Sequence, residues 1–398
     1  MGYLQYLLPK HLALLGVDMH VITMNLPPYH QMKNFYETYA GFNDGSDLKP
    51  GTIEKLDGFT LHVLSHRRVC GYTRMAGLFR KLRTLQPDVV QTTTNINWVG
   101  MDAAIGRIFL GYRLFTGCHY HASVFPLAQR ESEIWDLDRI RCFLTRGLPG
   151  GFVSLLAEKC HAITPDCADV AVRFFGVPRN KVDVCPLGVD TQLFFPISTD
   201  LQRQKAADLR RKLGLEQDDI ICVYSGRFSE EKNPLLLAKS IHSLTERGER
   251  YRGLFIGNGV QAADIRSCAG CVVHDFVPVF ELGNYFRAGD IGVWPTQESM
   301  SMLDAAACGI PIVANDTMSA TERLDGNGLA YRLNEQEDLV RALLALKTRE
   351  GRKKMGVEGA RKMVQEYSWD AIARRRLRDY EVSIGQIQTD RHLQRVTQ

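Results

Sequence analysis

The sequence predicts an α/β fold of two domains, each built as a parallel sheet covered by helices. A chain of 398 residues is too long for one comfortable hydrophobic core. Short apolar runs alternate with amphipathic helical patterns along both halves, which is typical of parallel sheets. The composition, 45% hydrophobic and 24% charged residues, is that of a globular protein, and a net charge of +4 is too small to indicate nucleic-acid binding.

The first half contains six short apolar runs that we expect to form strands. Amphipathic patterns between them predict helices over residues 4–15, 73–85 and 168–175. The expected strands are residues 19–23, 60–64, 89–92, 113–117, 162–164 and 182–185.

The second half repeats this alternation. Its expected strands are residues 220–224, 253–256, 272–274, 291–294, 312–314 and 329–331. The joint between the halves falls close to residues 188–195, and a charged, Gln-rich run over residues 200–214 opens the second domain. We therefore expect domains over residues 1–192 and 193–367, followed by a helix and a tail over residues 368–398.

A cationic loop follows the first strand of the second half. The stretch VYSGRFSEEKNP, from Val223 to Pro234, places Arg227 and Lys232 just before a helix that opens at Pro234. Cationic side chains, free backbone N–H groups and the positive end of a helix dipole all favour an anion such as a diphosphate. The alternative for Arg227 is a surface ion pair with Glu230 or Glu231.

A second stretch, WPTQESMSMLDAAACGIPIVA, begins at Trp294. It places Glu298 and Asp304 beside a small-residue helix, and carboxylates near a diphosphate pocket are suited to holding sugar hydroxyls. The alternative for Asp304 is a carboxylate that caps or charges the first turn of this helix. The expected donor-binding set is Gly226, Arg227, Lys232, Glu298, Ser299, Met300, Ser301 and Asp304.

Two histidines follow a strand of the first half. His119 and His121, in GCHYHAS, lie where ligands of open α/β sheets bind, at the carboxyl edge of the sheet. Their spacing places both side chains on one side of an extended segment. A structural role and a metal pair are the alternatives, although no third metal ligand is evident from the sequence.

These segments resemble the family-4 retaining glycosyltransferases of GT-B fold. The resemblance extends to KVDVCPLGVDTQLFFP, residues 181–196, and to EYSWDAIARRRLRDYEV, residues 366–382. It implies two Rossmann-like domains facing each other across a cleft, with acceptor groups in the first domain and donor groups in the second. It also implies that the last helix crosses back to the first domain.

The resemblance implies transfer of a hexose-type sugar, with retained anomeric configuration, from a nucleoside diphosphate sugar to a glycan or lipid-linked saccharide. This reaction would serve polysaccharide or lipopolysaccharide-type biosynthesis, without a cofactor or a metal ion. Arg227 and Lys232 would stabilise the diphosphate leaving group. Glu298 would contact a sugar hydroxyl and Asp304 the ribose, and one of His119 and His121 would face the donor sugar as a further catalytic residue.

The chain departs from the family pattern in two places. Members of the family begin with an apolar strand, whereas Tyr3 leads almost directly into the first helix, so we expect the first, central strand to be missing. The family usually shows Glu-x7-Glu, whereas this chain has Glu-x5-Asp. Because of these departures, a non-catalytic sugar-nucleotide or glycan-binding protein remains the alternative function. A sugar-nucleotide epimerase is a third possibility.

Membrane contact is a further expectation. No apolar run approaches the roughly 20 residues that span a bilayer, so cytoplasmic residence is the simplest reading. The basic segment over residues 66–81 also holds Tyr72 and Phe79, which is compatible with a helix on an anionic surface at the cytoplasmic face of the inner membrane. A solvated helix face is the alternative. Residues 127–151 are expected to form an acceptor lid.

Three short motifs carry less weight. Cys268 and Cys271 have metal-like spacing, but no second pair follows. Asp136-Leu137-Asp138 matches the Asp-x-Asp of metal-dependent transferases, although its neighbours resemble a solvated helix. Gly257-Asn258-Gly259 lacks the third glycine of a dinucleotide fingerprint.

Overall fold

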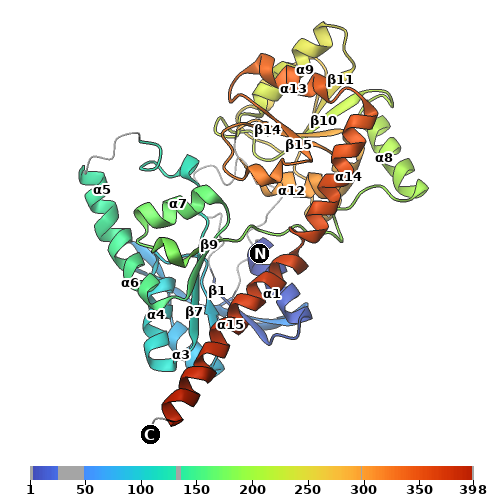
Figure 1. Cartoon of the computed structure of the whole chain (residues 1–398). Coiled ribbons are helices and arrows are strands. Elements are labelled where there is room, and N and C mark those ends of the chain that lie inside the picture. The colour runs from blue at the N-terminus through green and yellow to red at the C-terminus, as the bar shows by residue number, and fades with distance from the viewer. Residues whose placement is uncertain (1–2, 26–48, 131–135, 297, 397–398) are drawn as a thin grey trace. The chain divides into compact units, whose positions relative to one another are not determined.

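The computed structural model describes residues 3–25, 49–130, 136–296 and 298–396. These residues form two compact units (Figure 1). The described residues up to Leu187 and those from Ile372 onward make the first unit, and Gly188–Ala371 make the second. No helix among the described residues is long and apolar enough to cross a membrane.

The first unit contains two separate sheets and a hairpin. In the smaller sheet, β1 (Met19–Met24) runs parallel to β3 (Phe59–Leu64), and β2 (Ile53–Leu56) pairs antiparallel with β3. The larger sheet is parallel, in the order β6 (Val89–Gln91), β7 (Arg113–Cys118), β8 (Lys159–Ala162), β9 (Val182–Val184). Within the described ranges no strand pairs with the outer edge of β1 or of β6.

Helices surround these sheets. Buried Leu78 and Leu82 of α3, with Ala103 and Ala104 of α4, pack in one hydrophobic cluster with Leu114 of β7. The helices of the unit are α1 (Tyr3–Leu14), α3 (Leu78–Leu85), α4 (Trp98–Leu110), α5 (Leu137–Cys142), α6 (Leu148–Leu156), α7 (Pro165–Phe174) and α15 (Trp369–Val396). Short helical turns are η1 (Ala122–Val124), the π-helical η2 (Phe143–Gly147) and η3 (Arg179–Lys181).

Two sequence predictions are wrong in this unit. The helix predicted over residues 73–85 begins only at Leu78, because β4 (His66–Val69) and β5 (Tyr72–Met75) form a hairpin. Its two turn residues, Cys70 and Gly71, have φ values of 50° and 78°, the left-handed conformation of a tight hairpin turn. The strand predicted over residues 162–164 is instead β8, which ends at Ala162 because Pro165 starts α7.

The second unit is one six-stranded parallel sheet with helices. All six strands predicted in this half are confirmed, and buried side chains along the central strands β10, β13 and β14 explain their continuous apolar runs. The order is β12 (Cys271–His274), β11 (Tyr251–Ile256), β10 (Ile220–Ser225), β13 (Ile291–Trp294), β14 (Ile312–Asn315), β15 (Gly328–Tyr331). The helices are α8 (Asp200–Lys212), α9 (Pro234–Glu246), α10 (Ala262–Ser267), α11 (Val279–Ala288), α12 (Met300–Ala307), η4 (Thr321–Arg323), α13 (Gln336–Ala345) and α14 (Arg349–Gln365).

Candidate functional site

The strand order of the second unit reverses at β10. From β10 the chain continues to β11 and β12 on one side, whereas β13 pairs with β10 on the other side. Crevices at such a switch point, outside the carboxyl ends of the strands, are the ligand sites of open α/β sheets. The loops that follow β10 and β13 carry the two donor segments predicted from the sequence.

Lys232 joins the two loops directly. Its Nζ donates a hydrogen bond to the backbone oxygen of Glu298 over 3.1 Å, so the two segments meet although 66 residues separate them. Burial, and then the charge of Arg227, lower the pKa of Lys232 to about 8. The effect of the Arg227 charge on this pKa places the two cationic side chains near each other. Two cationic side chains are therefore held at one sheet edge.

The start of α12 is fixed to the end of β10. Ser299 precedes the helix, and its hydroxyl lies 2.8 Å from the hydroxyl of Ser301. Ser301 Oγ donates to the backbone oxygen of Ser225 over 3.1 Å, and Trp294 Nε1 donates to Ser301 Oγ over 3.1 Å. The positive end of the α12 dipole, with Met300 in its first turn, thus lies at the same edge as Lys232.

Glu298 is buried in an internal ion pair. Arg323 Nη1 lies 3.2 Å from Glu298 Oε2, and the two side chains are only 5% and 9% exposed. Ser319 Oγ and the backbone N–H of Ala320 each donate to Glu298 Oε1 over 3.1 Å. Sequence reasoning missed Arg323 and Ser319, because no local spacing signals a contact made between different loops.

Lys362 of α14 anchors the loop that carries Arg323. Its buried Nζ donates to the backbone oxygen of Glu322 over 2.8 Å and to Asn327 Oδ1 over 2.9 Å. It also donates to the backbone oxygen of Asp325. Three acceptors thus compensate the burial of this charge. The orientation of Glu298 depends on contacts that reach back to α14.

Several buried polar atoms at this edge lack a hydrogen-bond partner. They belong to residues of three loops, and such atoms are rare in folded proteins. Among the described residues they include Ser229 Oγ, Thr296 Oγ1, Glu298 Oε2 and Arg323 Nε. Donors and acceptors of this kind are suited to a ligand that carries both hydroxyl groups and negative charge.

Asp304 lies inside α12 rather than at its start. Its side chain is 3% exposed, and burial, followed by the nearby Asp190, raises its pKa well above the usual range of a carboxyl group. The alternative in which Asp304 caps the first turn is wrong, because Ser299 occupies the capping position. A protonated Asp304 can donate a hydrogen bond as well as accept one.

Two glycines bring the loops after β10 and β11 close together. Gly226 has φ 154° and Gly257 has φ 149°, a conformation that side chains rarely adopt. A Cβ atom on Gly257 would lie 1.9 Å from the backbone oxygen of Gly226. The motif Gly257-Asn258-Gly259 therefore serves close packing of the loop that carries Arg227.

The two histidines of the first unit have different environments. His121 Nδ1 lies 3.2 Å from Asp166 Oδ2. Burial alone would lower the pKa of His121, but hydrogen bonds to Asp166 and Cys167 outweigh it and raise this pKa to about 10. Burial, then the charge of Arg376, lower the pKa of His119 to about 4. His121 is therefore an imidazolium and His119 a neutral imidazole near pH 7.

Two clusters in the first unit bring potential metal ligands within 4.8 Å of one another. The first cluster consists of His121, Asp166 and Cys167. Its Asp166 carboxylate already accepts hydrogen bonds from the backbone N–H of Ala122 and from Thr164 Oγ1, besides its contact with His121. The second consists of His161, Asp183 and Asp379. His161 contacts Asp379, and cationic side chains pair with the two aspartates, which fixes the C-terminal helix to the sheet. The ion pairs are Lys159–Asp379 and Arg375–Asp183.

The remaining motifs have structural partners. Asp136 caps α5 by accepting from the backbone N–H of Arg139, and Arg130 bridges Asp136 and Asp138. The Cys268 and Cys271 thiols each donate to a backbone oxygen.

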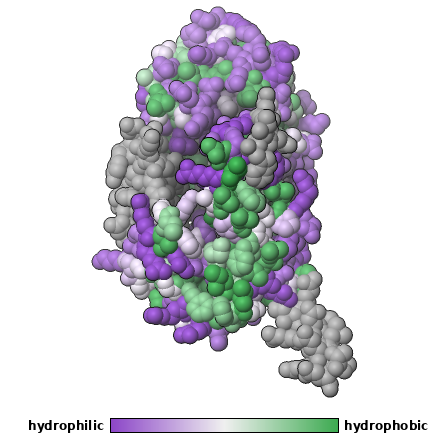
Figure 2. All heavy atoms as spheres, turned by 90° about the vertical axis from the view of Figure 1, so that its left-hand side faces the viewer, coloured by the Kyte–Doolittle hydropathy of each residue, from purple (hydrophilic) through white to green (hydrophobic). Residues whose placement is uncertain are grey.

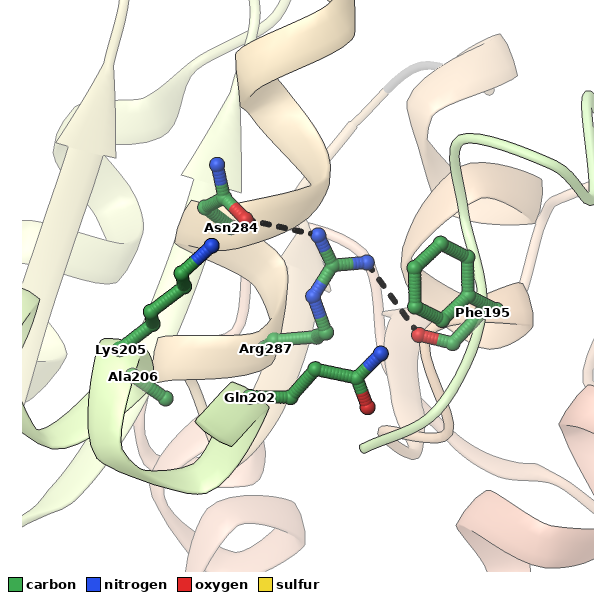
Figure 3. A pocket seen from close by; sticks show the side chains of 6 residues that line it. All are labelled: Phe195, Gln202, Lys205, Ala206, Asn284 and Arg287. Atoms are coloured by element: carbon green, nitrogen blue, oxygen red, sulfur yellow. Dashed lines mark hydrogen bonds between the residues drawn. The ribbon is translucent and has the colours of Figure 1, made fainter. Parts of the chain in front are cut away.

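A small cavity of about 160 Å³ lies at α8 and α11 of the second unit (Figure 3). Arg287 fills one side, donating to Asn284 Oδ1 over 2.8 Å and to the backbone oxygen of Phe195 over 3.4 Å. Drug-sized ligand pockets hold roughly 300–1,000 Å³. This hollow is too small for a nucleotide sugar and contains none of the residues from the β10 and β13 loops.

The chain is similar to known glycosyltransferases in both halves. Residues 5–193 match a sequence model described as Glycosyltransferase Family 4, and residues 219–349 match one described as Glycosyl transferases group 1.

Two curated relatives are D-inositol 3-phosphate glycosyltransferases. The protein from Xylanimonas cellulosilytica is 28% identical over 226 residues, which cover 53% of this chain and 54% of that protein. The chain thus spans about half the length of this relative. The protein from Thermomonospora curvata is 24% identical over 397 residues, covering 93% of this chain and 88% of that protein.

A solved structure shows the same fold. HepE from Anabaena, in complex with UDP, superposes with a TM-score of 0.63 at 14% sequence identity. The superposition covers 81% of this chain and 86% of that chain. The GT-B class predicted from the sequence is confirmed.

Proposed function

The chain belongs to the group 1 glycosyltransferases of family 4, and we propose that it transfers a sugar from a nucleoside diphosphate sugar to a hydroxyl group of a glycan or lipid-linked saccharide. The observation that carries this proposal is the contact between Lys232 and the backbone of Glu298 at the β10–β13 switch point. The UDP complex of the structural neighbour supports a nucleotide donor. We place the reaction in polysaccharide or lipopolysaccharide-type biosynthesis.

The diphosphate is proposed to bind Arg227, Lys232 and the start of α12. Both side chains are partly buried, so their charges are less screened than charges in open water. A leaving diphosphate gains negative charge as the glycosidic bond breaks, and fixed cations stabilise that charge more in the transition state than in the ground state. Because the protein itself supplies the compensating positive charge, we propose that no metal ion is needed.

The sugar and ribose hydroxyls are assigned to the two carboxyl groups. Glu298, oriented by its ion pair with Arg323, offers its carboxylate oxygens as hydrogen-bond acceptors. Burial raises the pKa of Asp304 and so favours its protonated form, which offers both a donor and an acceptor. The shorter Glu-x5-Asp spacing is accommodated because α12 starts directly after Ser299.

The first unit is proposed to supply the acceptor contacts and one histidine. His121 is the better hydrogen-bond donor of the pair, because Asp166 holds it in the charged form. The resemblance to the family suggests retention of anomeric configuration, and no side chain is assigned as a nucleophile.

The proposal is tested by diphosphate release from UDP-, GDP- and ADP-sugars, with and without an extract of lipid-linked saccharides. Lys232→Ala is compared with Lys239→Ala, which removes an exposed lysine from the neighbouring helix. The transferase is supported if diphosphate release depends on one donor, rises with acceptor and persists in a metal chelator. Release should also collapse in Lys232→Ala but not in Lys239→Ala. Nucleotide binding through Lys232 without release favours a sugar-nucleotide-binding protein instead. Epimerised donor without transfer would identify an epimerase.

A further inference from the structure

The first unit exposes an unusual number of large apolar side chains on one face. Eleven of the 23 exposed large hydrophobic residues of the described chain lie on α3, α4 and the continuous helical run from α5 to α6. Figure 2 views the side of α5 and α6 and shows hydrophobic residues gathered there. We define the apolar face by its most exposed members, which are Ile108, Phe109, Leu137, Leu144, Leu148 and Leu155.

The apolar face is a regular helical stripe. Leu137, Leu144, Leu148 and Leu155 recur at spacings of seven, four and seven residues, which places them on one side of a helix. These four side chains are 85%, 56%, 51% and 72% exposed, so this side is turned to solvent instead of the core. The opposite side packs inward through buried residues such as Val153.

The neighbouring helices extend the stripe. α4 packs between α3 and α6, and it exposes Ile108 and Phe109 at 58% and 71%. Phe109 also contacts Phe79 of α3, with the ring centres 6.1 Å apart. Contiguous exposed apolar surface of this kind marks an interaction site in a folded protein.

Beyond its first residues the apolar face is bordered by positive charges, whereas Asp136 and Asp138, beside Leu137, pair with Arg130. Arg83 follows Phe79 by one helical turn, and Arg141 lies one turn from both Leu137 and Leu144. Both arginines are exposed, and no acidic residue occurs between residues 139 and 157. Exposed leucine and phenylalanine side chains flanked by arginines are the pattern of helices that lie in the interface of an anionic bilayer.

We propose that the apolar face of α4, α5 and α6 docks on the surface of an anionic lipid membrane. The sequence placed membrane contact on a helix over residues 66–81, but residues 66–75 form a hairpin, so the surface is assigned to different elements. Much of the segment expected to be an acceptor lid is the α5–α6 run. Two copies meeting through this face would bring its arginines together, which disfavours self-association. The inference does not rest on transferase activity.

Binding of the full chain to vesicles tests this proposal. Vesicles of phosphatidylcholine alone are compared with vesicles that also contain phosphatidylglycerol, by co-sedimentation. The apolar variant Phe109→Gln/Leu148→Gln is matched by Phe280→Gln/Val357→Gln, which alters two exposed apolar residues of the second unit.

The contribution of charge is tested in the same assay. Arg83→Gln/Arg141→Gln is matched by Lys353→Gln/Lys354→Gln on α14. All these side chains are exposed, and unchanged thermal unfolding verifies that each variant folds.

We expect the unaltered chain to bind the anionic vesicles, and salt to weaken this binding. The apolar variant and the arginine variant should each lose roughly tenfold or more in partition coefficient, whereas their matched controls bind like the unaltered chain. The proposal is overturned if the unaltered chain leaves anionic vesicles unbound or if the apolar variant binds them equally well. It is also overturned if light scattering shows a dimer that the apolar variant dissociates, because the face would then join two copies.

Discussion

Arg323 Nη1 lies 3.2 Å from Glu298 Oε2, which joins a carboxylate of the candidate site to an arginine 25 residues further along the chain. Both side chains are almost fully buried, and Lys362 holds the loop around the arginine through backbone oxygens. A buried ion pair of this kind is more sensitive to loss of one partner than to loss of both. The ion pair therefore fixes the orientation of the Glu298 carboxylate at the candidate site.

We expect Arg323→Ala to lower the free energy of unfolding by about 3 kcal/mol, because it leaves the Glu298 carboxylate buried without its partner. Diphosphate release should fall as well, since Glu298 loses its orientation. The double variant Arg323→Ala/Glu298→Gln should recover part of the stability but none of the release. Urea unfolding and a release assay measure the two effects.

The control for this prediction is Arg341→Ala. Arg341 also pairs with a carboxylate, that of Asp338, but its own side chain is exposed, and exposed pairs contribute little to stability. Its stability and diphosphate release should remain unchanged. Additive losses in the Arg323 and Glu298 variants would show that the two residues act independently.

Nucleotide affinity should decrease as the pH rises through about 8, the pKa to which burial and Arg227 lower Lys232. A lysine is charged below its pKa, so attraction to a diphosphate is complete at lower pH and is lost above it. Titration calorimetry with UDP between pH 6.5 and 9.5, values that bracket this pKa by about 1.5 units, measures the change. Lys232→Arg, whose guanidinium stays charged, should abolish the decrease. An unchanged pH profile in this variant would assign the titration to another group.

Much of the second unit followed from the sequence because its central strands are buried on both faces. Runs such as Ile220–Ser225 are apolar throughout, so their boundaries are visible without knowledge of their neighbours. The meeting of Lys232 and Glu298 could be predicted for the same reason, since both residues follow strands at one sheet edge. Arg323 could not, because its contact depends on how a distant loop packs.

The first unit shows a different limit of sequence reasoning. A helical stripe such as Leu144 and Leu148 reports an apolar side of a helix, but not whether protein or solvent covers it. The sequence therefore did not predict that the apolar side of the α5–α6 run is exposed to solvent. The hairpin over residues 66–75 was missed because the left-handed conformation of Cys70 is unusual for that residue.

The contact between His121 and Asp166 should stabilise the first unit in a defined pH range. The pKa of His121 is raised to about 10 in the folded chain, from about 6.5 when unfolded, so its contribution is complete below about 6.5 and is lost as the pH rises through 10. The pKa of Asp166 is lowered, so its contribution is present above about 3.9 and is lost as the pH falls further.

Asp166→Asn should therefore cost most stability, about 1–3 kcal/mol, between roughly pH 4 and 6.5. The difference from the unaltered chain should shrink toward pH 10. Urea unfolding across this range measures it, and Asp169→Asn, at an exposed pair with Arg173, is the control. A stability difference that is flat with pH would contradict the charged pair.

Gly257→Ala should destabilise the second unit and weaken nucleotide binding together. The added Cβ would lie 1.9 Å from the backbone oxygen of Gly226, and the φ of 149° is itself unfavourable for alanine. We expect a loss of at least about 2 kcal/mol in unfolding free energy. Gly248→Ala is the matched control, because Gly248 also has a positive φ, 78°, but no atom within 4 Å of its Cβ position. That variant should lose only about 1 kcal/mol and keep its affinity for UDP. If both variants lose equal stability and keep their affinity for UDP, backbone conformation alone explains why position 257 requires glycine. The packing of Gly257 would then not position the loop that carries Arg227.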